Sequence, residues 1–102
     1  MPNRTATRPM PAVHPGEVLR EEFLIPYRMS AYQLAKAIKV PRTRVERIAK
    51  EQTAVTSDTA LRLARFFGTS SQFWMNLQAN HDLARASEHV ELDEIKPLRR
   101  AG

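Results

Sequence analysis

The sequence between residues 30 and 49 contains two short amphipathic segments separated by a single tight turn. Ser30 and Gln33 have the spacing of a capping box, which predicts the start of a helix. This helix runs to Ile38, and a second helix follows directly after Lys39 and Val40, because Pro41 suits the first turn of a helix. One narrow apolar stripe lies on each segment, formed by Leu34, Ala35 and Ile38 and then by Val45, Ile48 and Ala49. Two helices joined this closely predict a helix-turn-helix unit.

The net charge of the chain is concentrated in the same unit. The 102 residues include 16 Lys and Arg and 11 Asp and Glu, which gives a formal charge of +5. Residues 36–50 hold six of these bases and one of the acids, so the rest of the chain is neutral. A concentrated basic stretch is typical of proteins that bind a polyanion, although a solvated helix face can also carry such charges.

Hydrophobic spacing predicts three more helices around this unit. We expect one from Pro15 to just before Pro26, one from Thr56 or Ser57 to Gly68, and one from Thr69 or Ser70 onward. The side chains expected to face the core are Val18, Leu19, Phe23, Leu24, Ala60, Leu61, Ala64 and Phe67. The last of the three helices is expected to run through Phe73, Trp74, Leu77 and Ala84.

The predicted fold is therefore all-α. It is a compact five-helix, repressor-like helix-turn-helix domain over residues 15–86, with a flexible arm over residues 1–14 and a tail over residues 87–102. The tail is acidic at first and basic at its end. Four apolar residues within it, which could pack onto the domain or dock on a partner, are Val90, Leu92, Ile95 and Leu98.

Composition argues against several other kinds of site. The chain has no Cys, which excludes disulfides, thiol catalysis and thiolate metal sites. His14, His81 and His89 lack the spacing of metal ligands, and no nucleophile is accompanied by a base, so we expect no metal, no cofactor, no small-molecule substrate and no enzyme. Neither a membrane-spanning run nor a secretory signal is present, which predicts a cytoplasmic protein.

The basic residues of the second helix have the chemistry needed to read DNA. The major groove is about 12 Å wide and admits one helix, in which Arg can bind guanine and a Thr methyl can contact thymine. We expect Arg42, Thr43, Arg44 and Arg47 to read base edges. Contacts to phosphates, which give affinity with little sequence information, are expected from Ser30, Gln33, Lys36, Lys39 and Lys50.

Four segments of the chain resemble known regulators. Residues 30–48 (SAYQLAKAIKVPRTRVERI) resemble the helix-turn-helix of phage repressors. With residues 14–24 (HPGEVLREEFL), 58–69 (DTALRLARFFGT) and 73–80 (FWMNLQAN), the chain is similar to HigA-type antitoxins of bacterial toxin–antitoxin modules. The resemblance covers roughly residues 14–83. Its most specific part is the FWMNLQ run, which is not a general feature of repressors.

This resemblance implies two roles. Such antitoxins neutralise a cognate toxin, typically a HigB-type mRNA endonuclease related to RelE, and as dimers they bind a palindromic operator and repress their own operon. The fifth helix and the tail are the candidate dimer seam, with Phe73, Trp74 and Leu77 as its residues, although Trp74 also fits the core. Two alternatives stay open: a stand-alone repressor, and a toxin inhibitor that has lost DNA binding.

The chain departs from the phage-repressor pattern at three places. Lys39 stands where repressors commonly have Gly in the turn, and Lys50-Glu51 stands where they have Asn-Gly. If these backbone positions are left-handed, a side chain there costs about 1 kcal/mol. Ala31 replaces a Gln that contacts phosphate in many repressors, so we do not expect that contact.

Overall fold

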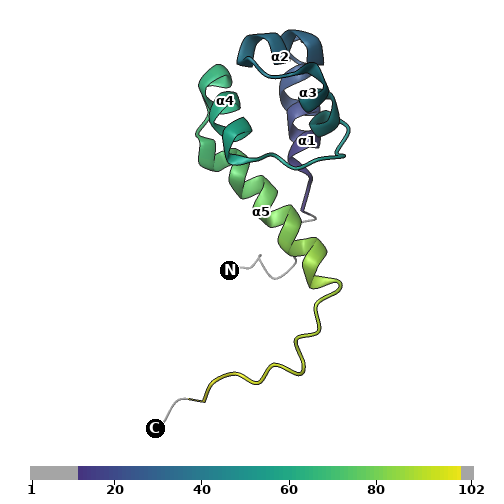
Figure 1. The fold of residues 1–102 in the computed structure, drawn as a ribbon, viewed down its shortest axis with the longest axis vertical. Coiled ribbons are helices and arrows are strands. Elements are labelled where there is room, and N and C mark those ends of the chain that lie inside the picture. Colours follow the sequence, from purple (N-terminus) through teal and green to yellow (C-terminus); the bar gives the residue numbers. More distant parts are fainter. Residues whose placement is uncertain (1–11, 100–102) are drawn as a thin grey trace, which may run out of the picture.

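The computed structural model describes residues 12–99 (Figure 1). The described chain forms α1 (Pro15–Val18), π-helical turns η1 (Leu19–Leu24), α2 (Ala31–Ile38), α3 (Arg42–Ala49), α4 (Ser57–Phe67) and α5 (Ser71–Ser87). Since η1 continues α1 without a break, this range holds five helices, and the predicted all-α, repressor-like fold is confirmed. Of the arm predicted over residues 1–14, the first eleven residues lie outside the described range.

Side-chain caps set the starts of the helices, as the sequence predicts. The Ser30 hydroxyl accepts a hydrogen bond from the backbone N–H of Gln33 at 3.0 Å, and Gln33 Oε1 accepts one from the N–H of Ser30 at 2.9 Å. The capping box is therefore complete. Thr56 and Ser70 cap α4 and α5, and α4 ends at Gly68, whose φ of +78° is the left-handed conformation that favours glycine.

The core takes apolar side chains from every helix. Trp74 on α5 is fully buried, and its ring centroid lies 5.3 Å from that of Phe23 and its Nε1 donates to Thr69 Oγ1 at 2.8 Å. Burying one large apolar side chain contributes about 1.5–3 kcal/mol. Other core residues that are almost completely buried are Leu19, Leu34, Val45, Ile48, Val55 and Leu63.

The predicted apolar stripe of α4 is partly wrong. Leu61 was expected to face the core but is 62% exposed, and Leu63 is buried in its place. Helical spacing from Ala60 allows either leucine to join the stripe, and the packing of α4 against α2 and α5 selects Leu63.

The end of α5 and the tail leave the bundle. Figure 1 shows α5 leading out of the domain and residues 88–99 continuing away from it. All four apolar tail residues are exposed, from 51% for Val90 to 93% for Leu98. The tail therefore does not pack onto the domain, and docking on a partner stays a prediction. No helix within residues 12–99 is long and apolar enough to cross a membrane.

Candidate nucleic-acid interface

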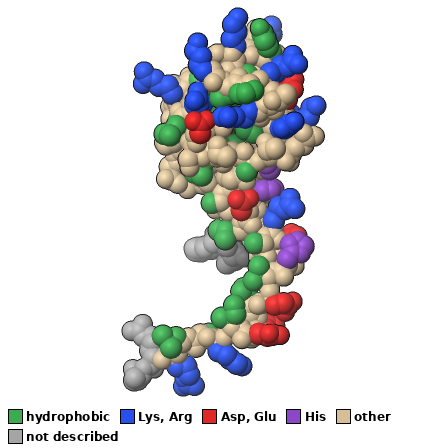
Figure 2. All heavy atoms as spheres, in the orientation of Figure 1, with side chains coloured by type: hydrophobic (Ala, Val, Ile, Leu, Met, Phe, Trp, Pro, Cys, Tyr) green, Lys and Arg blue, Asp and Glu red, His purple; other side chains and the backbone are tan. Residues whose placement is uncertain are grey.

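Basic side chains gather over one end of the molecule. Figure 2 shows Lys and Arg gathered over the end of the domain that carries α2 and α3, whereas the tail at the other end carries both acidic and basic side chains. Lys36, Lys39 and Lys50 are all exposed. The clustered bases give the helix-turn-helix a positive surface, as long-range attraction of a polyanion requires.

Three of the four predicted base-reading residues come together. Thr43, Arg44 and Arg47 line a shallow hollow between α3 and the start of α4, with Thr53 and Thr56 on its other side. Arg42 does not join them, because its Nε lies 3.3 Å from Glu46 Oε2 one turn along α3. The structure therefore places Thr43, Arg44 and Arg47 at one accessible surface and Arg42 beside it.

Ser30 and Gln33, two predicted phosphate contacts, begin α2. Both side chains are exposed, and both already take part in the capping box. Their first role is consequently structural: they fix where α2 begins. Pro41 similarly holds the N-cap position of α3 rather than its first turn, and its carbonyl accepts from the N–H of Arg44 at 3.0 Å.

Both helices of the unit end on a left-handed residue that is not glycine. Lys39 after α2 has φ +65°, and Glu51 after α3 has φ +63°. In each case the next N–H bonds back five residues, from Val40 to Ala35 O and from Gln52 to Arg47 O. This is the backbone pattern that glycine usually supplies at a helix C-terminus. The replaced glycines therefore leave the turn geometry intact and carry strain of about 1 kcal/mol each.

Two arginines outside the basic stretch bind these helix ends. Arg62 donates from Nη1 to the carbonyls of Ile38 at 2.8 Å and Lys39 at 3.3 Å. Arg20 donates to the carbonyl of Ala49 and to Glu51 Oε2, and its hydrogen bonds to Glu21 and then to Glu51 raise the pKa of Arg20. Cations at helix C-termini are favourable because they complement the carbonyl dipoles. Neither role was predicted from the sequence.

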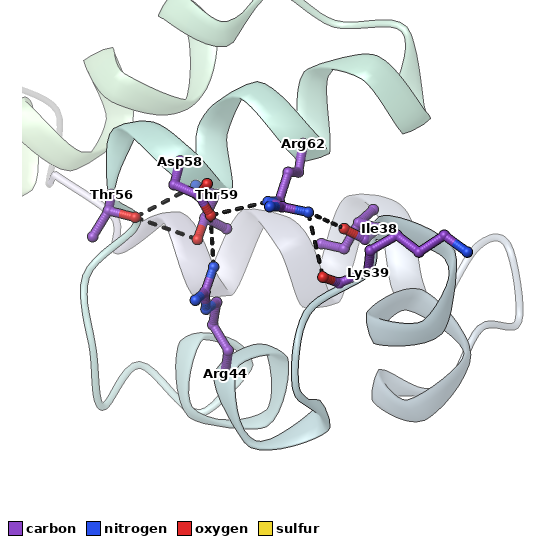
Figure 3. Close-up of polar contacts among 7 residues, drawn as sticks. All are labelled: Ile38, Lys39, Arg44, Thr56, Asp58, Thr59 and Arg62. Carbon is purple, nitrogen blue, oxygen red and sulfur yellow. Dashed lines mark hydrogen bonds and ion pairs between the residues drawn. The ribbon is translucent and has the colours of Figure 1, made fainter.

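Asp58 connects α3 with α4 (Figure 3). Its Oδ2 accepts from Arg44 Nη1 at 2.7 Å and from Arg62 Nε at 3.0 Å. The hydrogen bonds from Arg62 and from Arg44 lower the pKa of this carboxyl, so it is ionised at neutral pH. Asp58 also lies in the first turn of α4, where the helix dipole favours an anion. Nothing local indicated the contact with Arg44.

His14 fixes α1 against the rest of the domain. Its Nδ1 accepts from the N–H of Gly16 at 2.8 Å, and its ring packs edge-on against His81 at a centroid distance of 4.8 Å. Burial, and next the charge of His81, lower the pKa of His14, which favours the neutral ring that this hydrogen bond needs. No group of three potential metal ligands is found among residues 12–99.

The predicted dimer seam is divided between core and surface. Trp74 is fully buried within its own chain, so it belongs to the core and has no surface to offer a second copy. Phe73 is 37% exposed, and Leu77 is half-buried against the core. Phe73 and Leu77 therefore stay candidates for the seam.

Comparison with known proteins relates the whole domain to transcriptional regulators. The helix-turn-helix family model HTH_3 matches residues 19–74. The chain is 52% identical to virulence-associated protein I of Dichelobacter nodosus, covering 87% of this chain and 83% of that protein. It is 34% identical to antitoxin HigA-1 of Vibrio cholerae, covering 93% and 89%. Pseudomonas aeruginosa antitoxin HigA, solved with the higBA promoter, is 46% identical at a TM-score of 0.80, covering 86% and 99%.

Proposed function

The chain belongs to the helix-turn-helix family of HigA-type antitoxins, and from this premise we propose that it represses its own operon and neutralises a toxin. As a dimer it binds a palindromic operator, with α3 of each copy in the major groove. The observation that carries the proposal is the position of Thr43, Arg44 and Arg47 at one accessible surface. The two half-sites of a palindromic operator lie about 34 Å apart and are related by a two-fold axis, so the two α3 helices of the dimer need the same symmetry and spacing.

The two kinds of contact predict different mutant behaviour. Arg47→Ala removes a base contact, so it weakens operator binding by about 1–3 kcal/mol and relaxes discrimination at one base pair. Lys36→Ala removes a phosphate contact, so it weakens binding to all sequences alike and lowers the salt slope by about one. Arg85→Ala removes the same charge at an exposed position on α5, outside the helix-turn-helix, and is the matched control.

A gel shift of the upstream promoter fragment over a salt series tests the DNA role. We expect binding to the fragment to weaken as the salt concentration rises. We also expect the amount or the mobility of the shifted band to change when the product of the adjacent gene is added. Combined replacement of Arg42, Arg44 and Arg47 by Ala should abolish operator preference. If operator affinity hardly changes in that triple variant, α3 is not the recognition helix.

We place the toxin contact on the tail between residues 88 and 99. Its first part, residues 88–94, holds four acidic side chains together with the exposed apolar side chains of Val90 and Leu92. An RNA-cleaving enzyme needs a basic surface to hold its polyanionic substrate, and an acidic segment complements such a surface. A chain that ends at residue 87 should bind operator but fail to neutralise the toxin. If the truncated chain neutralises the toxin fully, the tail is not part of the toxin interface. The mass of the truncated chain, measured by light scattering, reports whether the tail also holds the dimer together.

Two other functions make different predictions. A stand-alone repressor would bind the promoter in the absence of any toxin gene nearby. A protein-only inhibitor would co-purify with a toxin and give no salt-sensitive operator shift. The second is disfavoured because both left-handed helix ends of the unit are retained.

A further inference from the structure

The Arg44 side chain is held by one of its three nitrogens. Arg44 Nη1 donates to Asp58 Oδ2 at 2.7 Å, and Nε and Nη2 have no hydrogen-bond partner within residues 12–99. The Nε–Nη2 edge is one of the two donor pairs of a guanidinium that fit the O6 and N7 acceptors of guanine. The Arg44 side chain is 40% exposed and lines the hollow together with Thr43 and Arg47.

The carboxylate that holds Arg44 is itself fixed. Asp58 lies in the first turn of α4, where the helix dipole favours an anion, and Arg62 Nε donates to the same Oδ2 at 3.0 Å. Arg62 in turn donates to the carbonyls of Ile38 and Lys39 in the turn before α3. Figure 3 shows this continuous path from the turn, through α4, to the side chain of Arg44.

We propose that Asp58 is a positioning residue that sets the sequence specificity of DNA binding by holding Arg44 in its base-reading orientation. This inference rests on the proposed operator-binding function and adds a residue that lies outside the recognition helix. A long side chain loses considerable rotamer entropy when it binds a base. Because the ion pair with Asp58 already restricts Arg44 in the free protein, less of this entropy is lost on binding to the operator.

The same carboxylate opposes binding to DNA in general. Asp58 is ionised, its side chain is 54% exposed, and it lies beside the surface that would face phosphates. A negative charge there weakens attraction to any duplex, whatever its sequence. Asp58 therefore lowers affinity for every duplex and raises the preference for the operator, so its removal should strengthen binding to non-operator DNA and weaken discrimination.

Replacement of Asp58 by Asn separates the two effects. We would measure binding of wild type, Asp58→Asn, Arg44→Ala and the double variant by fluorescence anisotropy. The probes are the operator duplex, a scrambled duplex of equal length, and operators with single base-pair changes. Glu22→Gln makes the same charge change at an exposed position on η1 and is the matched control.

We expect Asp58→Asn to bind scrambled DNA several-fold more tightly and to lose about tenfold in the ratio of operator to scrambled affinity. The loss of discrimination should fall on the base pair that Arg44→Ala also affects, and it should disappear in the Arg44→Ala background. Asp58→Glu, which keeps the charge, should restore part of the ratio. These readouts do not follow from a general loss of stability, which thermal melting of each variant measures separately.

Three outcomes overturn the inference. In the first, the specificity ratio of Asp58→Asn equals that of wild type. In the second, discrimination is lost equally at all base pairs or persists without Arg44, which would mean that Asp58 acts on the fold and not through that side chain. In the third, wild type itself does not distinguish operator from scrambled DNA; then the proposed function is wrong and the role of Asp58 fails with it.

Discussion

Replacement of Gly16 by Ala tests how closely α1 and α3 are packed. Gly16 lies in α1, and a Cβ built on it would stand 1.7 Å from the carbonyl oxygen of Ile48 and 2.8 Å from its carbonyl carbon. An ordinary C···O contact is about 3.3 Å or more. Because both neighbours are backbone atoms, the methyl group fits only if the start of α1 moves by about 1.5 Å from α3. That movement also strains the hydrogen bond from Gly16 to His14.

The energetic cost of this clash should exceed the stability that Ala gains over Gly from its higher helix propensity. Ala is favoured over Gly inside a helix by about 0.5–1 kcal/mol. Overpacking of this kind costs about 1–3 kcal/mol, and a clash between two backbones lies at the upper end of that range. We therefore expect the Gly16→Ala variant to lose about 2 kcal/mol in the free energy of unfolding, which corresponds to roughly 10 °C in Tm.

Gly68 provides the matched control for this variant. A Cβ there meets nothing within 4 Å, but the φ of +78° is unfavourable for a side chain, so Gly68→Ala should cost about 1 kcal/mol. Asn tolerates left-handed backbone and should be accepted better than Ala at position 68, whereas at position 16 Asn should be worse than Ala. Urea unfolding followed by circular dichroism measures all four variants. A Gly16→Ala protein as stable as wild type would refute the close contact between α1 and α3.

Three further substitutions test other parts of the structure. Burial lowers the pKa of His14, so the unfolded chain binds a proton at this ring more readily than the folded chain does. The free energy of unfolding should therefore fall as the pH drops below about 6.5. The His14→Asn variant keeps a capping oxygen and should flatten the curve of Tm against pH. Lys39→Gly should relieve the left-handed strain and raise the free energy of unfolding by about 0.5 kcal/mol in urea titrations, while lowering the salt slope of DNA binding. Trp74→Phe should cost about 2 kcal/mol by circular dichroism, since it leaves a small cavity and removes the donor to Thr69; unchanged stability would mean that Trp74 is not a core residue.

Local interactions made most of the fold predictable. Ser30 and Gln33 bond to each other's backbone across three residues, and Gly68 needs only its own φ, so neighbouring sequence determines both features. The apolar stripes of α2 and α3 were also read correctly, since three residues at helical spacing suffice for a short helix. The prediction that Leu61 is buried was wrong because Leu63 is equally apolar, and only contacts with other helices decide which of the two is buried.

The parts of the site that the sequence did not reveal depend on contacts between separate elements. Arg44 and Asp58 are fourteen residues apart, and their ion pair exists only because α4 begins beside the first turn of α3. Arg20 reaches Ala49 across twenty-nine residues. The sequence therefore identified side chains that lie together at the accessible surface of α3, but not the side chains that orient or support them.

Arg20 and Arg62 explain why the unit keeps its shape without the usual glycines. A side chain at Lys39 or Glu51 costs about 1 kcal/mol in left-handed backbone, and hydrogen bonds to the exposed helix-end carbonyls are of the same order. The two replacements also bring charges that glycine lacks: Lys39 adds a cation near the turn, and Glu51 supplies an oxygen for Arg20. The left-handed turn geometry is thus kept without glycine, and the hydrogen bonds of the two arginines offset strain of a similar size.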